Sequence, residues 1–301
     1  MQVTPKCDSF CAFCEHRAEA RGQELDLPAL RRVSEGLSAI GSLVVNLCGG
    51  DPFLRSDLPD IVASFAPSHY TLVTTNGWLV NPENARAVWS AGLHSATVMM
   101  ESADPARHDA ATGLPGSHAR AVGAVSLLLR ARTRLSGQVN IKLRLAPGTA
   151  SEVEPLAELA SRLGVTMTVE PSFPVAEGRA KSGLSEALAA LRRRHRSLVS
   201  TSSYLARFDE ALDGGVPGCQ AGRAFFNVDH RGRVAKCIEF QGPGDQAGDL
   251  TSEQADVVLA RLRRMCETNT CRSCWHSSRG EVEGLYTLRG LIDRLPGILR
   301  P

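Results

Sequence analysis

The sequence has no long hydrophobic run and almost no net charge. No stretch of 18 consecutive apolar residues occurs and no signal sequence opens the chain, so we expect no membrane partner and a cytoplasmic location. The formal net charge of +2 is too small to indicate binding to nucleic acid. A hydrophobic content of 43% is ordinary for a globular protein that buries a sizeable core.

Cysteine is the residue that the sequence uses in an unusual way. The chain has nine cysteines, and because the cytoplasm keeps thiols reduced, we do not expect disulfides. Three cysteines lie near the N-terminus, five lie between Cys219 and Cys274, and Cys48 stands alone between the groups. This clustering indicates metal binding at two places.

The first group is Cys7, Cys11 and Cys14, in CxxxCxxC spacing just after a predicted strand at Met1 to Pro5. Such tight spacing lets three sulfurs converge on one metal centre. A structural zinc site takes four protein ligands, whereas a cubane iron-sulfur cluster held by three thiolates keeps one iron open. A zinc knuckle, or three unrelated buried thiols, is the alternative that this loop leaves open.

Strands and helices are predicted to alternate after this loop. The segment Ser42 to Leu47, rich in valine and free of charge, is expected to be a strand buried on both faces, with Cys48 as a buried strand residue. We predict further strands at 70–75, 95–102, 139–145 and 165–170, and helices at 26–38, 58–65, 83–91, 119–132 and 153–163. Six strands alternating with helices predict an α/β fold, a partial (β/α)6 TIM-like barrel whose ligands lie at the carboxyl ends of the strands.

Polar and glycine-containing motifs stand where these strands end. The second strand runs into Gly49-Gly50-Asp51-Pro52, in which two glycines allow close backbone approach to a ligand and Asp51 adds a carboxylate. A tight corner of the chain is the plainer interpretation of this turn. The candidate residues at the later strand ends are Asn76, Glu101, Ser102, Arg144, Leu145 and Glu170.

The cysteine loop, with Phe13 before its last cysteine, resembles the cluster loop of the radical S-adenosylmethionine (SAM) enzymes. Gly49 to Pro52 is similar to the GGEP motif of that superfamily, with Asp51 in place of glutamate, and Asn76-Gly77 is similar to its TNG turn. The resemblance implies a [4Fe-4S] cluster on the three cysteines, whose open iron binds SAM for reductive cleavage to a 5'-deoxyadenosyl radical. It also implies that Ser102 faces the SAM ribose. The residues expected to contact the cofactors are Phe13, Gly49, Gly50, Asp51, Pro52, Asn76, Ser102, Arg144 and Leu145.

The second group of cysteines follows a break at Gly214 to Gly218. Cys219 and Cys237 flank a predicted hairpin, 224–228 with 233–235, and a helix at 259–265 precedes the last three cysteines. This part resembles the SPASM and twitch extensions of radical SAM enzymes. The resemblance implies one auxiliary [4Fe-4S] cluster, held by Cys219, Cys237, Cys271 and Cys274, with a zinc ribbon as the competing interpretation. Cys266 is left over, either as a packed helix-end thiol or with a role as ligand or in the chemistry.

The domain division that we expect has three parts. Residues 1–180 form the radical SAM barrel and end in Glu177 to Ala180, which resembles the family's exit from the barrel. Residues 181–213 form a helical bridge, and residues 214–301 form the auxiliary domain, a twitch- or SPASM-like hairpin with a helix.

The function expected from these features is abstraction of hydrogen from a substrate C–H bond. Glu101 and Glu170 at strand ends favour an amine-rich small molecule, such as an aminoglycoside or aminocyclitol of antibiotic biosynthesis, epimerised or dehydrogenated at a carbinol carbon. The candidate hydrogen donors are Cys266, Cys48 and, if the second cluster is held without it, Cys237. A flavodoxin or ferredoxin is the expected external electron donor. The alternatives are maturation of a ribosomally made peptide, with the recognition module on a separate protein, and a non-enzymatic metal-binding protein.

Overall fold

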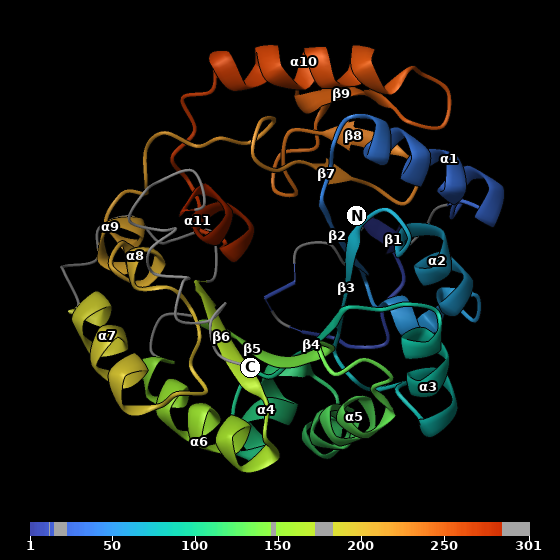
Figure 1. Cartoon of the computed structure of the whole chain (residues 1–301). Helices are drawn as coiled ribbons and strands as arrows, with labels where there is room; N and C mark the ends of the chain where they lie inside the picture. The colour runs from blue at the N-terminus through green and yellow to red at the C-terminus, as the bar shows by residue number, and fades with distance from the viewer. Residues whose placement is uncertain (12, 15–22, 146–148, 172–182, 285–301) are drawn as a thin grey trace.

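Six parallel strands form one sheet in the order in which they occur in the chain (Figure 1). The structure, a computed structural model, describes residues 1–11, 13–14, 23–145, 149–171 and 183–284. The strands are β1 (Gln2–Thr4), β2 (Val44–Gly49), β3 (Tyr70–Thr75), β4 (Ser95–Met99), β5 (Gln138–Leu145) and β6 (Thr166–Pro171). Sequential order with parallel pairing is the topology of repeated βα units. The predicted partial barrel is confirmed.

Helices cover the outside of the sheet in Figure 1. They are α1 (Leu27–Ala39), α2 (Leu58–Phe65), α3 (Pro82–Ser90), α4 (Pro105–Thr112), α5 (Ser117–Ala131) and α6 (Val153–Leu163). The start of α1 is set by Asp26, whose side chain accepts a hydrogen bond from the Ala29 amide at 2.9 Å. The apolar spacing of α1 then places Leu30, Val33 and Leu37 in the core.

The two faces of the barrel sheet differ in character. On the outer face Leu47, Val73, Val98 and Ile141 are completely buried against helices. The alternate positions, which face the inside, are largely polar. They are linked by hydrogen bonds from Thr74 to Asn46 (3.0 Å), from Asn140 to Thr168 (3.0 Å) and from Thr166 to Asn140 (3.1 Å). A closed TIM barrel fills this space with branched apolar side chains, so the polar lining is a feature of this chain.

The prediction that the second strand is buried on both faces is wrong. Val44 is 58% exposed and Asn46 is also exposed, because their side chains lie on the inner face, which is not packed with apolar groups. Cys48, predicted to be buried, is only half-buried. Its thiol lies 3.4 Å from the carbonyl oxygen of Met1, across the β1–β2 pair.

A helical segment leads from the barrel to a small antiparallel sheet. The helices are α7 (Leu184–Arg194), α8 (Ser202–Leu205) and α9 (Phe208–Leu212), and the strands are β7 (Asn227–Val228), β8 (Arg233–Ala235) and β9 (Gln246–Asp249). The predicted hairpin is present, and β9 adds a third strand. The predicted barrel exit at Glu177 to Ala180 lies outside the described residues.

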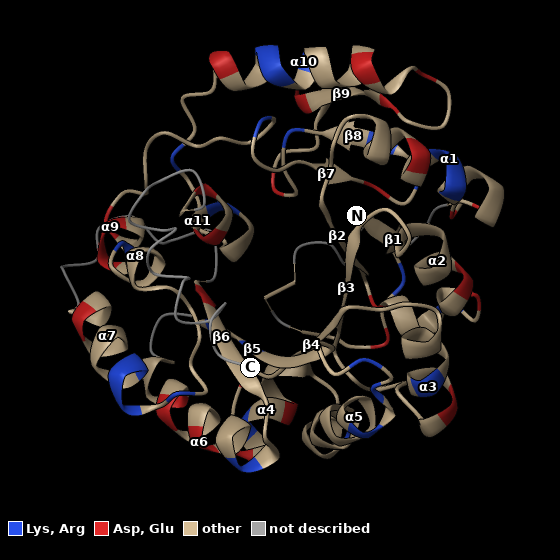
Figure 2. Cartoon of the chain, viewed as in Figure 1, with Lys and Arg blue, Asp and Glu red and all other residues tan. Residues whose placement is uncertain are grey.

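Within the described residues, the C-terminal part also contains two helices, α10 (Ala255–Glu267) and α11 (Ser277–Gly284). Helix α10 contacts β9 and α1, and α11 contacts α8, so both helices bring the C-terminal part against earlier segments of the chain (Figure 1). Figure 2 shows basic and acidic residues mixed along outer helices such as α7 and α10, in keeping with the small net charge. Among the described helices, none combines the length and the apolar character needed to cross a bilayer.

Candidate functional site

The glycine-rich turn after β2 holds the start of the cysteine loop. The amide of Gly50 donates to the Thr4 carbonyl at 2.9 Å, and the amide of Asp51 donates to the Lys6 carbonyl at 2.8 Å. A Cβ atom on Gly50 would overlap the Lys6 carbonyl, and one on Gly49, at φ 141°, would overlap that of Thr4. The close approach that these glycines permit is therefore to the chain that leads into Cys7.

Asp51 joins the ends of β2 and β3. Its side chain is 1% exposed and accepts hydrogen bonds from the Thr75 hydroxyl (2.8 Å) and from the amides of Asn76 (2.7 Å) and Phe53 (2.9 Å). Burial raises the pKa of Asp51 to about 6, against the opposing effect of these donors. Pro52 follows as the first residue of a short 3-10 helix, η2 (Pro52–Leu54). Because the carboxylate is occupied within the protein, this motif presents mainly its backbone to a ligand.

Two further anchors hold the rest of the cysteine loop. The side-chain amide of Asn76, just after β3, donates to Asp8 at 2.7 Å and lies 3.8 Å from the Cys7 sulfur. The amide of Phe10 donates to the carbonyl of Thr112, the last residue of α4, at 2.9 Å. The loop is thus tied to the ends of β2, β3 and α4. The helix α4 was not predicted, since its sequence is mostly polar.

The three thiols of the loop lie close enough to affect one another. Burial raises the pKa of Cys11 to about 12, with further contributions from Glu101, Cys7 and Cys14. Burial also raises the pKa of Cys7. Among the described residues, no group of three or more His, Cys, Asp or Glu side chains already has the arrangement of a metal site. The donor set is nevertheless the one that a cubane cluster with an open iron takes, and iron favours the thiolate form.

Side chains from two neighbouring strands lie beside this loop. The Arg144 guanidinium, on β5, lies 4.4 Å from the centre of the Phe13 ring. Burial raises the pKa of Cys11 and of Glu101, which follows β4 by two residues, and the charge of Arg144 opposes this rise at both. The structure therefore brings together four residues predicted for the site. Leu145, the next residue on β5, is 4% exposed and belongs to the core.

Glu101, beside the cysteine loop, has a carboxyl group whose pKa is shifted. Burial raises its pKa to about 7, although Arg144 opposes the shift. Its backbone amide donates to Nδ1 of His108 at 3.2 Å. Burial lowers the pKa of His108 to about 4, so this imidazole is neutral at pH 7 and serves as the acceptor. The carboxyl group of Glu101 is therefore available in both protonation states near neutral pH.

Ser102 is buried and hydrogen-bonded within the protein. It is 2% exposed, and its hydroxyl donates to Glu152 at 2.5 Å and accepts from the Asp104 amide at 2.9 Å. Arg107 binds the other oxygen of Glu152 at 2.7 Å. The hydroxyl proton is therefore already used within the protein. Contact of Ser102 with the SAM ribose stays a prediction. Glu152 lies fifty residues away in the sequence, and no sequence motif indicated that it would bind Ser102.

Glu170 is bound by other parts of the chain. Its Oε2 accepts from the Ser277 amide (3.0 Å) and hydroxyl (2.5 Å) and lies 3.4 Å from Nζ of Lys142. Against the effect of burial, Lys142, His276 and Ser277 hold the pKa of Glu170 well below its usual range. The carboxylate joins β6 to α11. Its expected role toward a substrate amine stays a prediction, and these partners give it a structural role.

The second group of cysteines also converges. Cys219 and Cys237 are buried in one small cluster with Ala221, against which Cys271 packs. Burial raises the pKa of Cys237 to about 11, with contributions from Cys219 and Cys271, and that of Cys274 to about 12, with contributions from Cys219 and Cys237. These mutual effects indicate that the four predicted ligands are neighbours, a donor set that suits a cubane cluster.

Cys266 lies at the edge of this group, on α10. Its sulfur is 4.0 Å from Oε1 of Gln220, and a Cβ on Gly222 would lie 3.6 Å from the Cys266 Cβ. Cys219 raises its pKa, after the larger effect of burial. These contacts are all with the segment that carries Cys219, which favours a place beside the second cluster over a place at the barrel strands.

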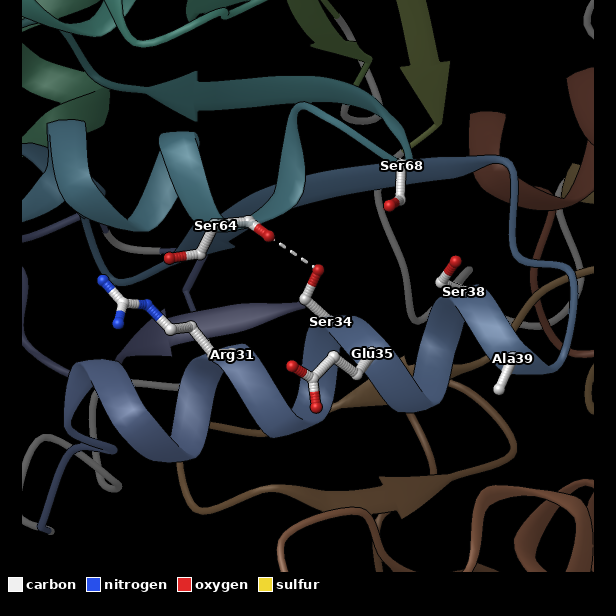
Figure 3. A pocket seen from close by; sticks show the side chains of 7 residues that line it. All are labelled: Arg31, Ser34, Glu35, Ser38, Ala39, Ser64 and Ser68. Atoms are coloured by element: carbon white, nitrogen blue, oxygen red, sulfur yellow. Dashed lines mark hydrogen bonds between the residues drawn. The ribbon is translucent and has the colours of Figure 1, made fainter.

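A separate shallow pocket lies outside the barrel, between α1 and α2 (Figure 3). It is lined by Arg31, Ser34, Glu35, Ser38, Ala39, Ser64 and Ser68. The Ser34 hydroxyl donates to the Ser64 carbonyl at 2.8 Å and so joins the two helices. None of the residues predicted for the active site belongs to this pocket, so it is no part of the candidate site.

Comparison with known families agrees with the anchored cysteine loop. Residues 1–141 match the model of the radical SAM superfamily. Residues 1–141 are therefore similar to the radical SAM domain, and the cofactors of that superfamily are a [4Fe-4S] cluster and SAM. The matched region contains the cysteine loop, the glycine turn, Asn76 and Glu101.

Individual relatives differ in how much of the chain they match. A probable GTP 3',8-cyclase of Pyrobaculum aerophilum is 31% identical over 55% of this chain and 54% of its own length. The chain thus spans about half of that protein. The mycofactocin maturase MftC of Mycolicibacterium smegmatis is 25% identical over 91% of this chain and 74% of its own length. Streptococcus suis SuiB bound to precursor peptide SuiA has a similar fold, with a TM-score of 0.69 at 13% identity over 96% of this chain and 72% of SuiB.

Proposed function

We propose that the chain is a radical SAM maturase that oxidises or epimerises a residue of a peptide. The observation that carries this proposal is the extent of the similarity. The likeness to MftC and SuiB reaches over 91% and 96% of the chain and so includes most of the second group of cysteines, whereas the likeness to the GTP 3',8-cyclase covers 55%. A peptide substrate thus replaces the amine-rich small molecule as the first hypothesis.

The residues of the proposed site have different roles. Cys7, Cys11 and Cys14 hold the first cluster, and when bound, this cluster and SAM supply the 5'-deoxyadenosyl radical that removes a hydrogen atom from the substrate. The backbone of Gly49, Gly50 and Asp51 fixes the loop, as its hydrogen bonds to Thr4 and Lys6 suggest. The other residues proposed to surround the cofactor are Phe13, Pro52, Asn76, Ser102, Arg144 and Leu145.

A second [4Fe-4S] cluster is proposed on Cys219, Cys237, Cys271 and Cys274. Its part would be to accept an electron from the substrate radical, which gives net oxidation. The proposal divides the chain into a barrel domain (1–180), a helical bridge (181–213) and an auxiliary domain (214–301). A flavodoxin or ferredoxin is the proposed source of the electron that the first cluster needs.

The polar inside of the barrel supports a substrate with many hydrogen-bonding groups. Asn46, Thr74 and Asn140 present amide and hydroxyl groups that both donate and accept, which suits the peptide backbone. Lys142, which bonds to Glu170 and to the Ser277 hydroxyl (2.8 Å), adds a cation on the same face. This lining is less suited to an apolar substrate, because its polar groups would lose their hydrogen bonds to water.

An amine-rich small molecule remains the second candidate, because of one observation. Burial raises the pKa of Glu101, and the opposing charge of Arg144 does not compensate this effect. A substrate ammonium group would supply a compensating charge.

Label uptake from heavy water should distinguish these hypotheses. The reconstituted protein is incubated with SAM and a strong reductant in deuterated water, in parallel with candidate precursor peptides and with aminoglycosides. We expect a peptide to be consumed with formation of 5'-deoxyadenosine. Loss of two hydrogens from the peptide indicates oxidation, whereas gain of one deuterium indicates epimerisation by a thiol such as Cys266. Turnover of aminoglycosides without turnover of any peptide would contradict the first hypothesis.

Glu101 is proposed to accept the proton that the substrate radical loses. Because its pKa is raised to about 7, the group is protonated below neutral pH and a carboxylate above it, so product formation should rise between about pH 6 and about pH 8. We expect Glu101→Gln to lower product formation about 100-fold and to remove this rise, while uncoupled SAM cleavage continues. Glu154→Gln, at an exposed glutamate paired with Arg194, is the control. An unchanged pH profile in Glu101→Gln would contradict the role.

A further inference from the structure

Arg279, on α11, is a completely buried arginine in the C-terminal part of the chain. Its Nη1 donates to the carbonyl of Cys274 at 2.6 Å, and its Nη2 donates to the carbonyls of Val216 at 2.6 Å and Pro217 at 3.0 Å. One guanidinium group therefore bridges the segment that leads into Cys219 and the segment that carries Cys271 and Cys274. The planar, forked geometry of arginine suits such a bridge, and lysine cannot reproduce it.

The charge of Arg279 is only partly compensated. Its Nε lies 3.3 Å from Oε1 of Glu283, one turn further along α11, and that oxygen also accepts the Gln220 amide at 2.8 Å. The hydrogen bonds from its Nη1 and Nη2 atoms go to neutral carbonyl groups. Burying a charge in this way is costly, and replacing a buried ion pair by apolar groups is often neutral for stability. Fold stability alone is therefore a weak reason for this arrangement.

The positive charge lies within electrostatic reach of the second group of thiols. The guanidinium donates to the carbonyl of Cys274 itself and to the carbonyl of Pro217, two residues before Cys219. Arg207 offers a comparison, because its guanidinium lies 5.1 Å from the centre of the Trp275 ring, much like that of Arg279 at 5.4 Å. The side chain of Arg207 is 37% exposed, so solvent screens its charge.

We propose that Arg279 is a positioning residue for the second cluster, which fixes the two cysteine segments and, through its buried charge, raises the reduction potential of the cluster. The inference rests on the proposed second cluster. A cubane with four thiolate ligands carries net negative charge, and one more electron makes it more negative, so a nearby buried cation favours the reduced state. The electron comes from the substrate radical, whose proton leaves to a base, and the product is the oxidised residue.

The test uses the full chain with Cys7, Cys11 and Cys14 replaced by alanine, so that the second cluster is the only one. Iron counting should give roughly four irons, and a potentiometric titration followed by electron paramagnetic resonance gives the midpoint potential. We expect Arg279→Gln to favour the oxidised state about tenfold, which is about 59 mV for one electron. The midpoint potential of Arg279→Lys should lie closer to that of the triple alanine protein than the potential of Arg279→Gln does, but Arg279→Lys should bind less iron. Arg207→Gln, the matched control, should leave the potential unchanged.

Glu283→Gln tests the charge separately if Arg279→Gln fails to hold iron. This variant keeps an acceptor for Arg279 and for the Gln220 amide but removes the opposing charge, so the midpoint potential should rise. Unchanged potentials in both Arg279→Gln and Glu283→Gln would overturn the electrostatic role while leaving the second cluster intact. Zinc without iron in the triple alanine protein would overturn the second cluster itself, and the role of Arg279 with it.

Discussion

Replacing Cys11 with alanine should abolish formation of 5'-deoxyadenosine. Removal of one of three thiolates leaves too few ligands for the first cluster, so reductive SAM cleavage should fall to the level seen without protein. After anaerobic reconstitution, iron content should drop from roughly eight atoms per chain to roughly four, because the second group of cysteines is untouched. The measurements are iron counting, visible absorption and chromatography of the nucleoside product under strong reductant.

Cys48→Ala is the matched control for this experiment. Cys48 is also a free, half-buried cysteine of the barrel, but it lies on β2 with its thiol beside the Met1 carbonyl and is not one of the three cysteines of the loop. The Cys48→Ala variant should retain both its iron content and its SAM cleavage activity. Normal SAM cleavage by Cys11→Ala would contradict the assignment of the loop, and equal loss in Cys48→Ala would show that the effect is not specific.

The barrel was predictable from the sequence because its strands and helices follow strong local patterns. The segments predicted at 58–65, 70–75 and 153–163 have the same bounds as α2, β3 and α6 in the structure. Each is an apolar segment between clear turn residues. The character of the inner face was not predictable in the same way. Val44 looks like a core residue in a valine-rich strand, and only the curvature of the sheet and the polar neighbours Asn46 and Thr74 leave it exposed.

The cysteine loop could be identified because its three thiols lie close together in the sequence, and the contacts that hold it were partly predictable. Asn76 and Asp51 were identified from motifs, but as ligand-binding groups. In the structure they bind Asp8, Thr75 and the loop backbone. Such contacts between segments distant in sequence carry no periodic signal.

The partners of Glu170 illustrate the same limit at the other side of the barrel. Lys142 precedes it by 28 residues and Ser277 follows it by 107, and neither has a pattern that points to Glu170. The sequence therefore identified the carboxylate at the strand end but not its structural use. Arg279 is a comparable case, because an arginine on a short polar helix is expected to be exposed, and only tertiary packing buries it.

Gly50→Ala should disable the first cluster while the barrel stays folded. The added Cβ would overlap the Lys6 carbonyl group and approach the Cys7 amide, and because these are backbone atoms, the start of the cysteine loop has to move. Displacement of a catalytic group by about 1 Å can cost about 100-fold in rate, so we expect at least that loss in SAM cleavage, with reduced iron. Overpacking should also lower the free energy of unfolding by about 1–3 kcal/mol.

Gly123→Ala is the control for this substitution, since the same methyl group there meets nothing within 4 Å on α5. It should keep full activity and raise the free energy of unfolding by up to about 1 kcal/mol, because alanine favours helix over glycine. Circular dichroism and thermal unfolding of both variants report the fold, and SAM cleavage reports the site. Full activity in Gly50→Ala would mean that the loop does not depend on its contact with the glycine turn. Asn76 and Thr112 alone would then have to hold Cys7 in place.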